Sequence, residues 1–152
     1  MPLVPNTLSV ERVVAAPPER IFDLLADPAR HQELDGSGTV RDPHRAPERL
    51  SLGARFGMEM KAAVGYRMVN EVVEFEEGRR IAWQPRPAAG ALRPFVGGRI
   101  WRYELEPVEG GTLVRETWDI SQEKVPPLLW ALRPLTRIGM TRTLDRLEEL
   151  VT

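Results

Sequence analysis

Residues 98–121, GRIWRYELEPVEGGTLVRETWDIS, carry the clearest secondary-structure pattern in the chain. Aromatic or aliphatic side chains alternate with charged ones along both halves of this stretch, as in strands with one buried face. The turn-forming segment Val108–Gly111 separates the halves. The stretch therefore predicts an antiparallel hairpin of two strands, Gly98–Pro107 and Thr112–Ser121.

The alternation assigns one face of this hairpin to the protein interior. The inward-facing side chains are Trp101, Tyr103 and Leu105 on the first strand and Val114, Glu116, Trp118 and Ile120 on the second. Glu116 is the one carboxylate on this apolar face, and a buried carboxylate must be paired, hydrated or protonated. Two interpretations stay open. Glu116 is either a polar anchor or general base at a pocket floor, or a structural residue, ion-paired with Arg67 or close to an open rim.

The chain before the hairpin begins with one strand and two helices. Thr7–Ala15 is rich in β-branched residues and alternates in polarity, which predicts a strand. Pro18 occupies a position that the first turn of a helix tolerates, and an apolar helical face follows it. A second, short helix is expected from Pro28 to Leu34, ending at the turn cluster Asp35–Gly38.

Four further strands are expected between these helices and the hairpin. Their ranges are Gly38–Pro43, Ala54–Val64, Arg67–Glu76 and Arg80–Gln84, with a Pro/Ala/Gly-rich loop at Pro85–Pro94. The third of these strands is ambiguous, since its apolar residues place Arg67 and Glu71 on the inner face unless a β-bulge reverses the alternation.

The last segment, Leu128–Val151, has helical spacing of apolar residues. Pro134 is expected to kink this helix or to delay its start. Its apolar residues Trp130, Leu132, Leu135 and Ile138 are expected mainly in the core.

Composition excludes several classes of protein. The chain of 152 residues has a net charge of −1, no cysteine and two histidines, His31 and His44. Nucleic-acid binding, a metal site and a cofactor are therefore not expected. Because no apolar run approaches 18 residues and the N-terminus lacks a signal peptide, we expect a cytoplasmic protein without stable membrane insertion. The length predicts a single domain over residues 1–152.

The predicted order is strand, two helices, six strands and a long C-terminal helix. This order indicates an α+β fold, β-α-α-β6-α. One long helix covers a large antiparallel sheet only if the sheet curves around it, so a curved sheet is expected.

Several segments resemble a known family in the same order along the chain. They are Phe22–Pro28, Asp35–Val40, Gly53–Phe56, Glu74–Glu76, Arg79–Trp83, Trp101–Pro107 and Gly111–Thr117. They resemble the helix-grip fold of the START-like (SRPBCC) superfamily and, within it, the bacterial polyketide cyclase/dehydrase family. The resemblance implies a cavity between the sheet and the C-terminal helix that binds a lipid, a polyketide or another mostly apolar molecule.

Candidate ligand-binding residues are those expected to face this cavity. They are Phe56, Met58, Met60, Trp83, Phe95, Trp101, Tyr103, Glu116, Trp118, Met140 and Leu144. Glu116 and His31 are the candidate acid/base residues. His31 is alternatively a solvent-facing helix residue or a hydrogen-bond partner of the Asp35 turn.

Three functions are compatible with these features. The first is binding of a hydrophobic small molecule by a monomer or weak homodimer. The second is an aromatase/cyclase-type enzyme in which Glu116 or His31 moves protons within the same cavity. The third is a protein-interaction module, like the co-chaperones of the superfamily or a lipid-linked toxin. Whether the protein is an enzyme stays open, because one fold serves many functions.

Overall fold

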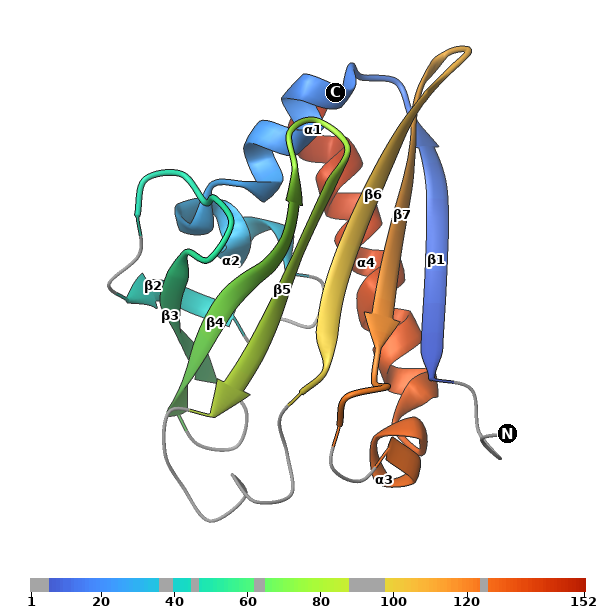
Figure 1. Ribbon diagram of the computed structural model, residues 1–152. Helices are drawn as coiled ribbons and strands as arrows, with labels where there is room; N and C mark the ends of the chain where they lie inside the picture. Colours follow the sequence, from blue (N-terminus) through green and yellow to red (C-terminus); the bar gives the residue numbers. More distant parts are fainter. Residues whose placement is uncertain (1–5, 36–39, 45–46, 62–64, 88–97, 124–125) are drawn as a thin grey trace.

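The computed structural model describes residues 6–35, 40–44, 47–61, 65–87, 98–123 and 126–152 (Figure 1). The first elements are β1 (Thr7–Val14), α1 (Pro18–Leu25), the 3-10 turn η1 (Pro28–Arg30) and α2 (His31–Leu34). Six strands follow: β2 (Val40–His44), β3 (Arg55–Lys61), β4 (Gly65–Glu76), β5 (Arg80–Pro87), β6 (Ile100–Val108) and β7 (Gly111–Asp119). The chain ends with α3 (Pro126–Trp130) and α4 (Arg133–Val151), so the predicted order of elements is confirmed.

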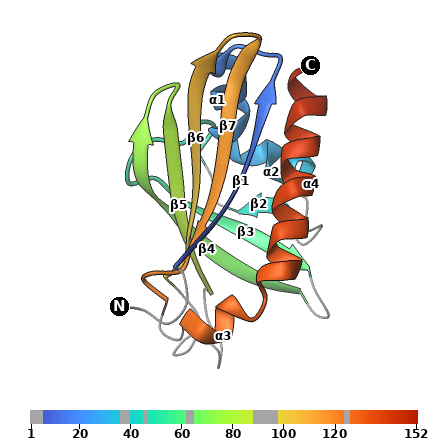
Figure 2. The ribbon, with the colours of Figure 1, turned by 90° about the vertical axis from the view of Figure 1, so that its right-hand side faces the viewer.

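All seven strands form one antiparallel sheet in the order β1-β7-β6-β5-β4-β3-β2. The first strand thus pairs with the last, and β1 and β2 form the two edges. Figure 2 shows the sheet curving around the side on which α1, α2 and α4 lie. This arrangement confirms the expected α+β helix-grip fold.

Local sequence explains where the first helices begin. Pro17 has extended backbone angles, and Pro18, which lacks an N–H, starts α1. The α1 side chains Ile21, Phe22, Leu24 and Leu25 are buried. The Asp27 carboxylate accepts a hydrogen bond from the Ala29 N–H and so caps the following 3-10 turn.

The interior contains two clusters of apolar side chains. The larger one joins α1, α2 and the second half of α4 to the inner face of the sheet. The smaller one consists of Leu8, Trp118, Ile120, Leu129 and Met140, with Trp101 and Trp130 packed against it. The inner face of β7 contributes to both clusters, through Val114 to the larger and Trp118 to the smaller.

One predicted boundary was wrong, and the expected effect of Pro134 on the C-terminal helix is observed. β5 runs to Pro87, so the expected loop at Pro85 begins later, and residues 88–97 lie outside the described ranges. The C-terminal helical segment is divided in two, because α3 ends at Trp130 and α4 begins at Arg133 with Pro134 in its first turn. This is the delayed start expected from a proline, which a helix tolerates only in its first turn.

The prediction that Leu132, Leu135 and Ile138 belong to the core was also wrong. Their exposed fractions are 50%, 70% and 50%. The buried residues of α4 begin at Met140, and that part of the helix packs on the sheet, α1 and α2. Helical spacing fixes which residues share a face, but not how far along the helix that face is covered.

β4, which corresponds to the ambiguous predicted strand Arg67–Glu76, contains a β-bulge that decides which of its side chains point inward. The register between β4 and β5 shifts between Val72 and Glu74. Asn70 and Val72 are buried, whereas Glu71 is half-exposed and binds Arg55 through a 3.0 Å ion pair. Glu71 therefore points outward, and the expectation that it shares an inner face with Phe75 is corrected by the bulge. The Arg67 side chain lies outside the described residues.

Candidate functional site

A buried tyrosine–glutamate pair lies on the inner face of the terminal hairpin. Tyr103 in β6 and Glu116 in β7 are directly opposite one another across the strands. The Tyr103 hydroxyl donates a hydrogen bond of 2.9 Å to Glu116 Oε2. The exposed fractions of Tyr103 and Glu116 are 4% and 2%. Glu116 Oε1, however, has no hydrogen-bond partner among the described residues, so a polar atom is buried without compensation.

Burial makes Glu116 a neutral acid at physiological pH. Loss of solvation raises the pKa of Glu116 from 4.5 to about 8, against the opposing hydrogen bond from Tyr103. The negative charge of Asp35 raises that pKa further. The pKa of Tyr103 is raised well above 10, mainly by burial and then by the charge on Glu116. Both members of the pair are therefore uncharged near pH 7.

Asp35 is a site residue that sequence reasoning missed. It lies at the C-terminal cap of α2, and its charge raises the pKa values of His31, Tyr103 and Glu116. Its backbone carbonyl accepts a 2.5 Å hydrogen bond from Arg146 Nη1 of α4. This bond ties the end of α2 to the C-terminal helix. No sequence pattern indicates it, because the two residues are 111 positions apart.

His31 is buried, so the interpretation of a solvent-facing helix residue was wrong. Its Nε2 lies 2.9 Å from the carbonyl oxygen of Leu25, which accepts the ring N–H. The side chain thus binds Leu25, and residues 36–38 of the Asp35 turn lie outside the described residues, so a bond to that turn stays a prediction. Burial is the main cause that lowers the pKa of His31, so the imidazole is neutral at pH 7. A role of His31 as acid/base or gate stays a prediction.

Three tryptophans lie next to the Tyr103–Glu116 pair, in the adjacent cross-strand row of β5, β6 and β7. Trp83 is opposite Trp101, and Trp101 is opposite Trp118. Trp83 lies 5.5 Å from Tyr103 between ring centroids, and His31 stacks on Trp83 at 4.8 Å. Trp101 and Trp118 lie 6.4 Å apart, and Trp130 stacks on Trp118. Trp83 and Trp101 are only half-buried, so aromatic ring surface lies beside the buried acid.

The candidate ligand-binding residues differ in their burial, and their role in binding stays a prediction. Phe56, Tyr103, Glu116, Trp118, Met140 and Leu144 are buried. Phe95 and the side chains of Met58 and Met60 lie outside the described residues. The cavity expected between the sheet and the C-terminal helix stays a prediction. Asn70, which sequence reasoning did not select, is a further buried polar side chain, with Nδ2 3.5 Å from the Phe56 carbonyl oxygen.

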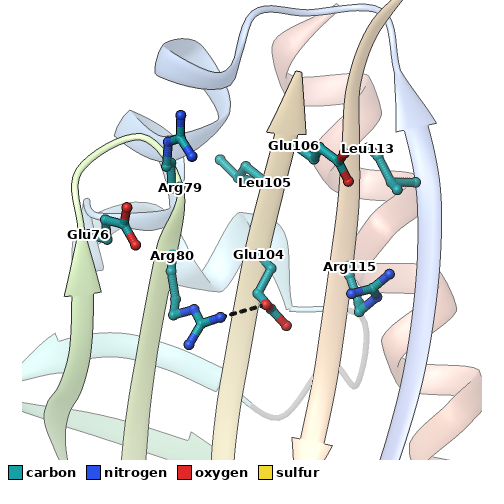
Figure 3. A pocket seen from close by; sticks show the side chains of 8 residues that line it. All are labelled: Glu76, Arg79, Arg80, Glu104, Leu105, Glu106, Leu113 and Arg115. Atoms are coloured by element: carbon teal, nitrogen blue, oxygen red, sulfur yellow. Dashed lines mark hydrogen bonds and ion pairs between the residues drawn. The ribbon is translucent and has the colours of Figure 1, made fainter. Parts of the chain in front are cut away.

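A separate hollow of about 200 Å³ lies on the outer face of the sheet (Figure 3). Its lining residues are Glu76, Arg79, Arg80, Glu104, Leu105, Glu106, Leu113 and Arg115. Arg80 and Glu104 form an ion pair of 2.9 Å across it. Three arginines face three glutamates here, so the hollow carries no net charge that would select an ionic ligand.

The described residues contain neither a metal-binding group nor a membrane-spanning helix. No group of three His, Asp or Glu side chains in these ranges is placed to hold a metal ion. No helix in the same parts of the chain is both long and apolar enough to cross a membrane.

A curved antiparallel sheet wrapped around a C-terminal helix, with aromatic and acidic side chains on its inner face, defines the helix-grip class of ligand-binding folds. Residues 6–152 match the model of a family described as polyketide cyclase / dehydrase and lipid transport, and the chain belongs to this family. The family indicates a fold that binds hydrophobic ligands.

Similar proteins support the fold and leave the ligand open. The uncharacterized protein Rv0088 of Mycobacterium tuberculosis is 36% identical over 117 residues, which are 76% of this chain and 48% of that protein. The chain thus spans about half the length of the curated relatives it matches. Protein CV1439 of Chromobacterium violaceum has a TM-score of 0.74 and 21% identity, over 97% of this chain and 98% of that one. Protein NE0264 of Nitrosomonas europaea has a TM-score of 0.73 and 19% identity, over 95% and 92%.

Proposed function

We propose that this protein binds a hydrophobic small molecule against the inner face of β5, β6 and β7, with Glu116 as its polar anchor. The observation that carries the proposal is Glu116 Oε1, a buried oxygen without a described hydrogen-bond partner. Leaving such an atom unpaired costs about 1–3 kcal/mol. A ligand that supplies the missing partner recovers this energy, so the free site is prepared for a bound molecule.

The surroundings of Glu116 support an apolar ligand. Trp83 and Trp101 are half-buried in the cross-strand row next to the pair and offer ring faces for contact. Ligand pockets combine such apolar walls with a few polar groups that fix orientation. Membership of a family described by polyketide cyclisation and lipid transport agrees with this kind of ligand.

A cyclase-type enzyme is the second candidate, and the pKa of Glu116 favours it. An acid whose pKa is about 8 can give up and regain a proton near neutral pH, as general acid/base catalysis requires. Here Glu116 is the better acid/base candidate, because the Nε2–H of His31 is already bonded to Leu25.

A titration with the uncharged hydrophobic dye Nile red tests the binding proposal. We expect saturable binding of one dye per chain, with quenching of tryptophan emission. Glu116→Leu should weaken this binding about three- to tenfold, since it removes one hydrogen bond to the dye carbonyl. The control is Glu104→Gln, whose side chain lies on the outer face of the same hairpin and pairs with Arg80.

The folded state of each variant is checked by circular dichroism and urea denaturation. Binding of Nile red that does not saturate in the wild-type protein would contradict the proposal. Equal weakening by Glu116→Leu and Glu104→Gln would remove Glu116 as the anchor.

A further inference from the structure

The charge and hydrogen-bonding state of Glu116 restricts which ligand the proposed site accepts. Tyr103 donates its hydroxyl hydrogen to Oε2. In a protonated carboxyl group the carbonyl oxygen is the better acceptor, so this bond makes Oε2 the carbonyl oxygen and leaves the acidic hydrogen on Oε1. Oε1 is the atom without a described partner. Glu116 therefore presents an unused O–H donor to the interior.

The groups that face Glu116 keep it in this uncharged form. From β6, Tyr103 donates to Glu116, and the negative charge of Asp35, just after α2, acts on it. From β1, the residue opposite Glu116 is the apolar Val10. Among the buried α4 side chains, Met140 and Leu144 are apolar, and the Thr143 hydroxyl donates to the Gly139 carbonyl. Arg146 of α4 donates to the backbone carbonyl of Asp35 and not to Glu116. No described cation contacts Glu116, and the nearby fixed charge is negative.

We propose that the interior site selects an uncharged ligand whose buried end carries a carbonyl oxygen, held by the Glu116 Oε1–H, and that it rejects a ligand with a carboxylate at that end. This inference rests on the proposed function. A carbonyl oxygen completes the one hydrogen bond that the site leaves open. A carboxylate brings a second negative charge into a buried environment where no described cation contacts Glu116, which is strongly unfavourable.

The proposal also makes ligand binding dependent on pH. When the Glu116 carboxyl ionises, its oxygens only accept hydrogen bonds, and a carbonyl has no hydrogen to donate. The preference for carbonyl ligands should therefore disappear in alkaline solution. A glutamine at position 116 keeps an N–H donor at every pH, so it separates the hydrogen bond from the titration.

Three molecules of nearly the same shape test the inference: 2-acetylnaphthalene, 2-isopropenylnaphthalene and 2-naphthoate. The ketone, the hydrocarbon and the carboxylate differ only in the group that would meet Glu116. Their dissociation constants are measured by tryptophan fluorescence at pH 6 and pH 9.5 for the wild type, Glu116→Gln and Glu116→Leu. Circular dichroism confirms at both pH values that each protein is folded.

At pH 6 the wild type should bind the ketone about three- to tenfold more tightly than the hydrocarbon, and the carboxylate at least tenfold more weakly than the ketone. At pH 9.5 the ratio between ketone and hydrocarbon should fall to about one. Glu116→Gln should keep the ratio at both pH values, and Glu116→Leu should show no preference at either.

Each other outcome overturns a defined part of the reasoning. Equal binding of ketone and hydrocarbon by the wild type at pH 6 would overturn the selectivity while leaving the hydrophobic site intact. Preferential binding of the carboxylate would show that Glu116 is not a neutral donor. If none of the three binds with saturation, both the proposed function and the inference fail. The ¹³C chemical shift of the Glu116 carboxyl gives a ligand-free check, because an apparent pKa below 6 would also overturn the inference.

Discussion

Replacing Glu116 by glutamine should stabilise the protein at neutral pH and not at acidic pH. The side chain is 2% exposed, and burial raises its pKa from 4.5 to about 8. Between these two values the folded protein retains a proton that the unfolded chain releases. Stability from this group is therefore complete below pH 4.5 and is lost as the pH rises toward 8. Glutamine does not titrate, so the variant avoids the loss.

The pKa of Glu116 sets the size of the effect. Each pH unit above 4.5 and below the folded-state pKa costs about 1.4 kcal/mol, which gives about 3 kcal/mol at pH 7. The Tyr103 hydroxyl, which donates to Oε2 in the wild type, can donate to the amide oxygen instead. We therefore expect Glu116→Gln to be up to about 3 kcal/mol more stable at pH 7, or roughly 6–12 °C in Tm. Urea denaturation of both proteins at pH 4, 5.5, 7 and 8.5 measures the difference.

The matched control is Glu104→Gln on the outer face of the neighbouring strand. Glu104 lies 2.9 Å from Arg80 in a partly exposed ion pair, so its replacement should change stability by less than about 1 kcal/mol. The reasoning about Glu116 is refuted if Glu116→Gln is less stable than the wild type at pH 7 by an amount that is the same at pH 4. That result would indicate an ionised, structurally paired glutamate.

Two further predictions concern α2 and the β6–β7 turn. Because burial lowers the pKa of His31, this group contributes a loss of stability as the pH falls below 6.5. The stability of His31→Gln relative to the wild type should therefore rise between pH 7 and pH 5 in urea denaturation, and a constant difference would contradict this. Gly111→Ala should cost more than about 3 kcal/mol, because φ is +147° and the new Cβ would meet the Val14 carbonyl oxygen. Gly110→Ala, with φ +89° and open space around it, should cost about 1–2 kcal/mol, and equal urea midpoints for the two variants would refute the steric argument.

The elements with strong local patterns were predicted well. The hairpin expected at Gly98–Pro107 and Thr112–Ser121 is observed at Ile100–Val108 and Gly111–Asp119. Period-two alternation places residues on a face wherever the strand is regular, and Gly110 and Gly111 mark the turn by their positive φ. The start of α1 at Pro18 has an equally local cause.

The errors arose where distant packing decides the outcome. The β4 bulge between Val72 and Glu74 inverts the alternation, and nothing in the surrounding sequence marks it. Leu135 has the spacing of a core residue in α4, yet its side chain is 70% exposed. In both cases the local pattern shows which residues share a face. Whether that face is buried depends on tertiary contacts, which the local pattern does not show.

Some residues of the candidate site could be predicted from local sequence, and others depend on packing between distant segments. Glu116 was found because a carboxylate interrupts an apolar face. An ion pair with Arg67 was one of the alternatives left open for it, and the hydrogen-bond partner observed among the described residues is Tyr103. A two-residue turn at Glu109 and Gly110 places Tyr103 opposite Glu116, so this contact could have been predicted from the sequence.

The effect of Asp35 on Tyr103 and Glu116 could not have been predicted, because it depends on how α2 packs over the sheet. The register of one hairpin thus supplies the buried acid and its hydrogen bond, while a helix from the other end of the chain supplies the negative charge. A cation in place of Asp35 would favour an ionised glutamate, which takes ligands that donate hydrogen bonds. Burial is the main cause that holds this glutamate neutral, and the charge of Asp35 adds to it. The kind of ligand that suits the proposed site therefore follows from packing between elements far apart in the chain, which local sequence patterns do not show.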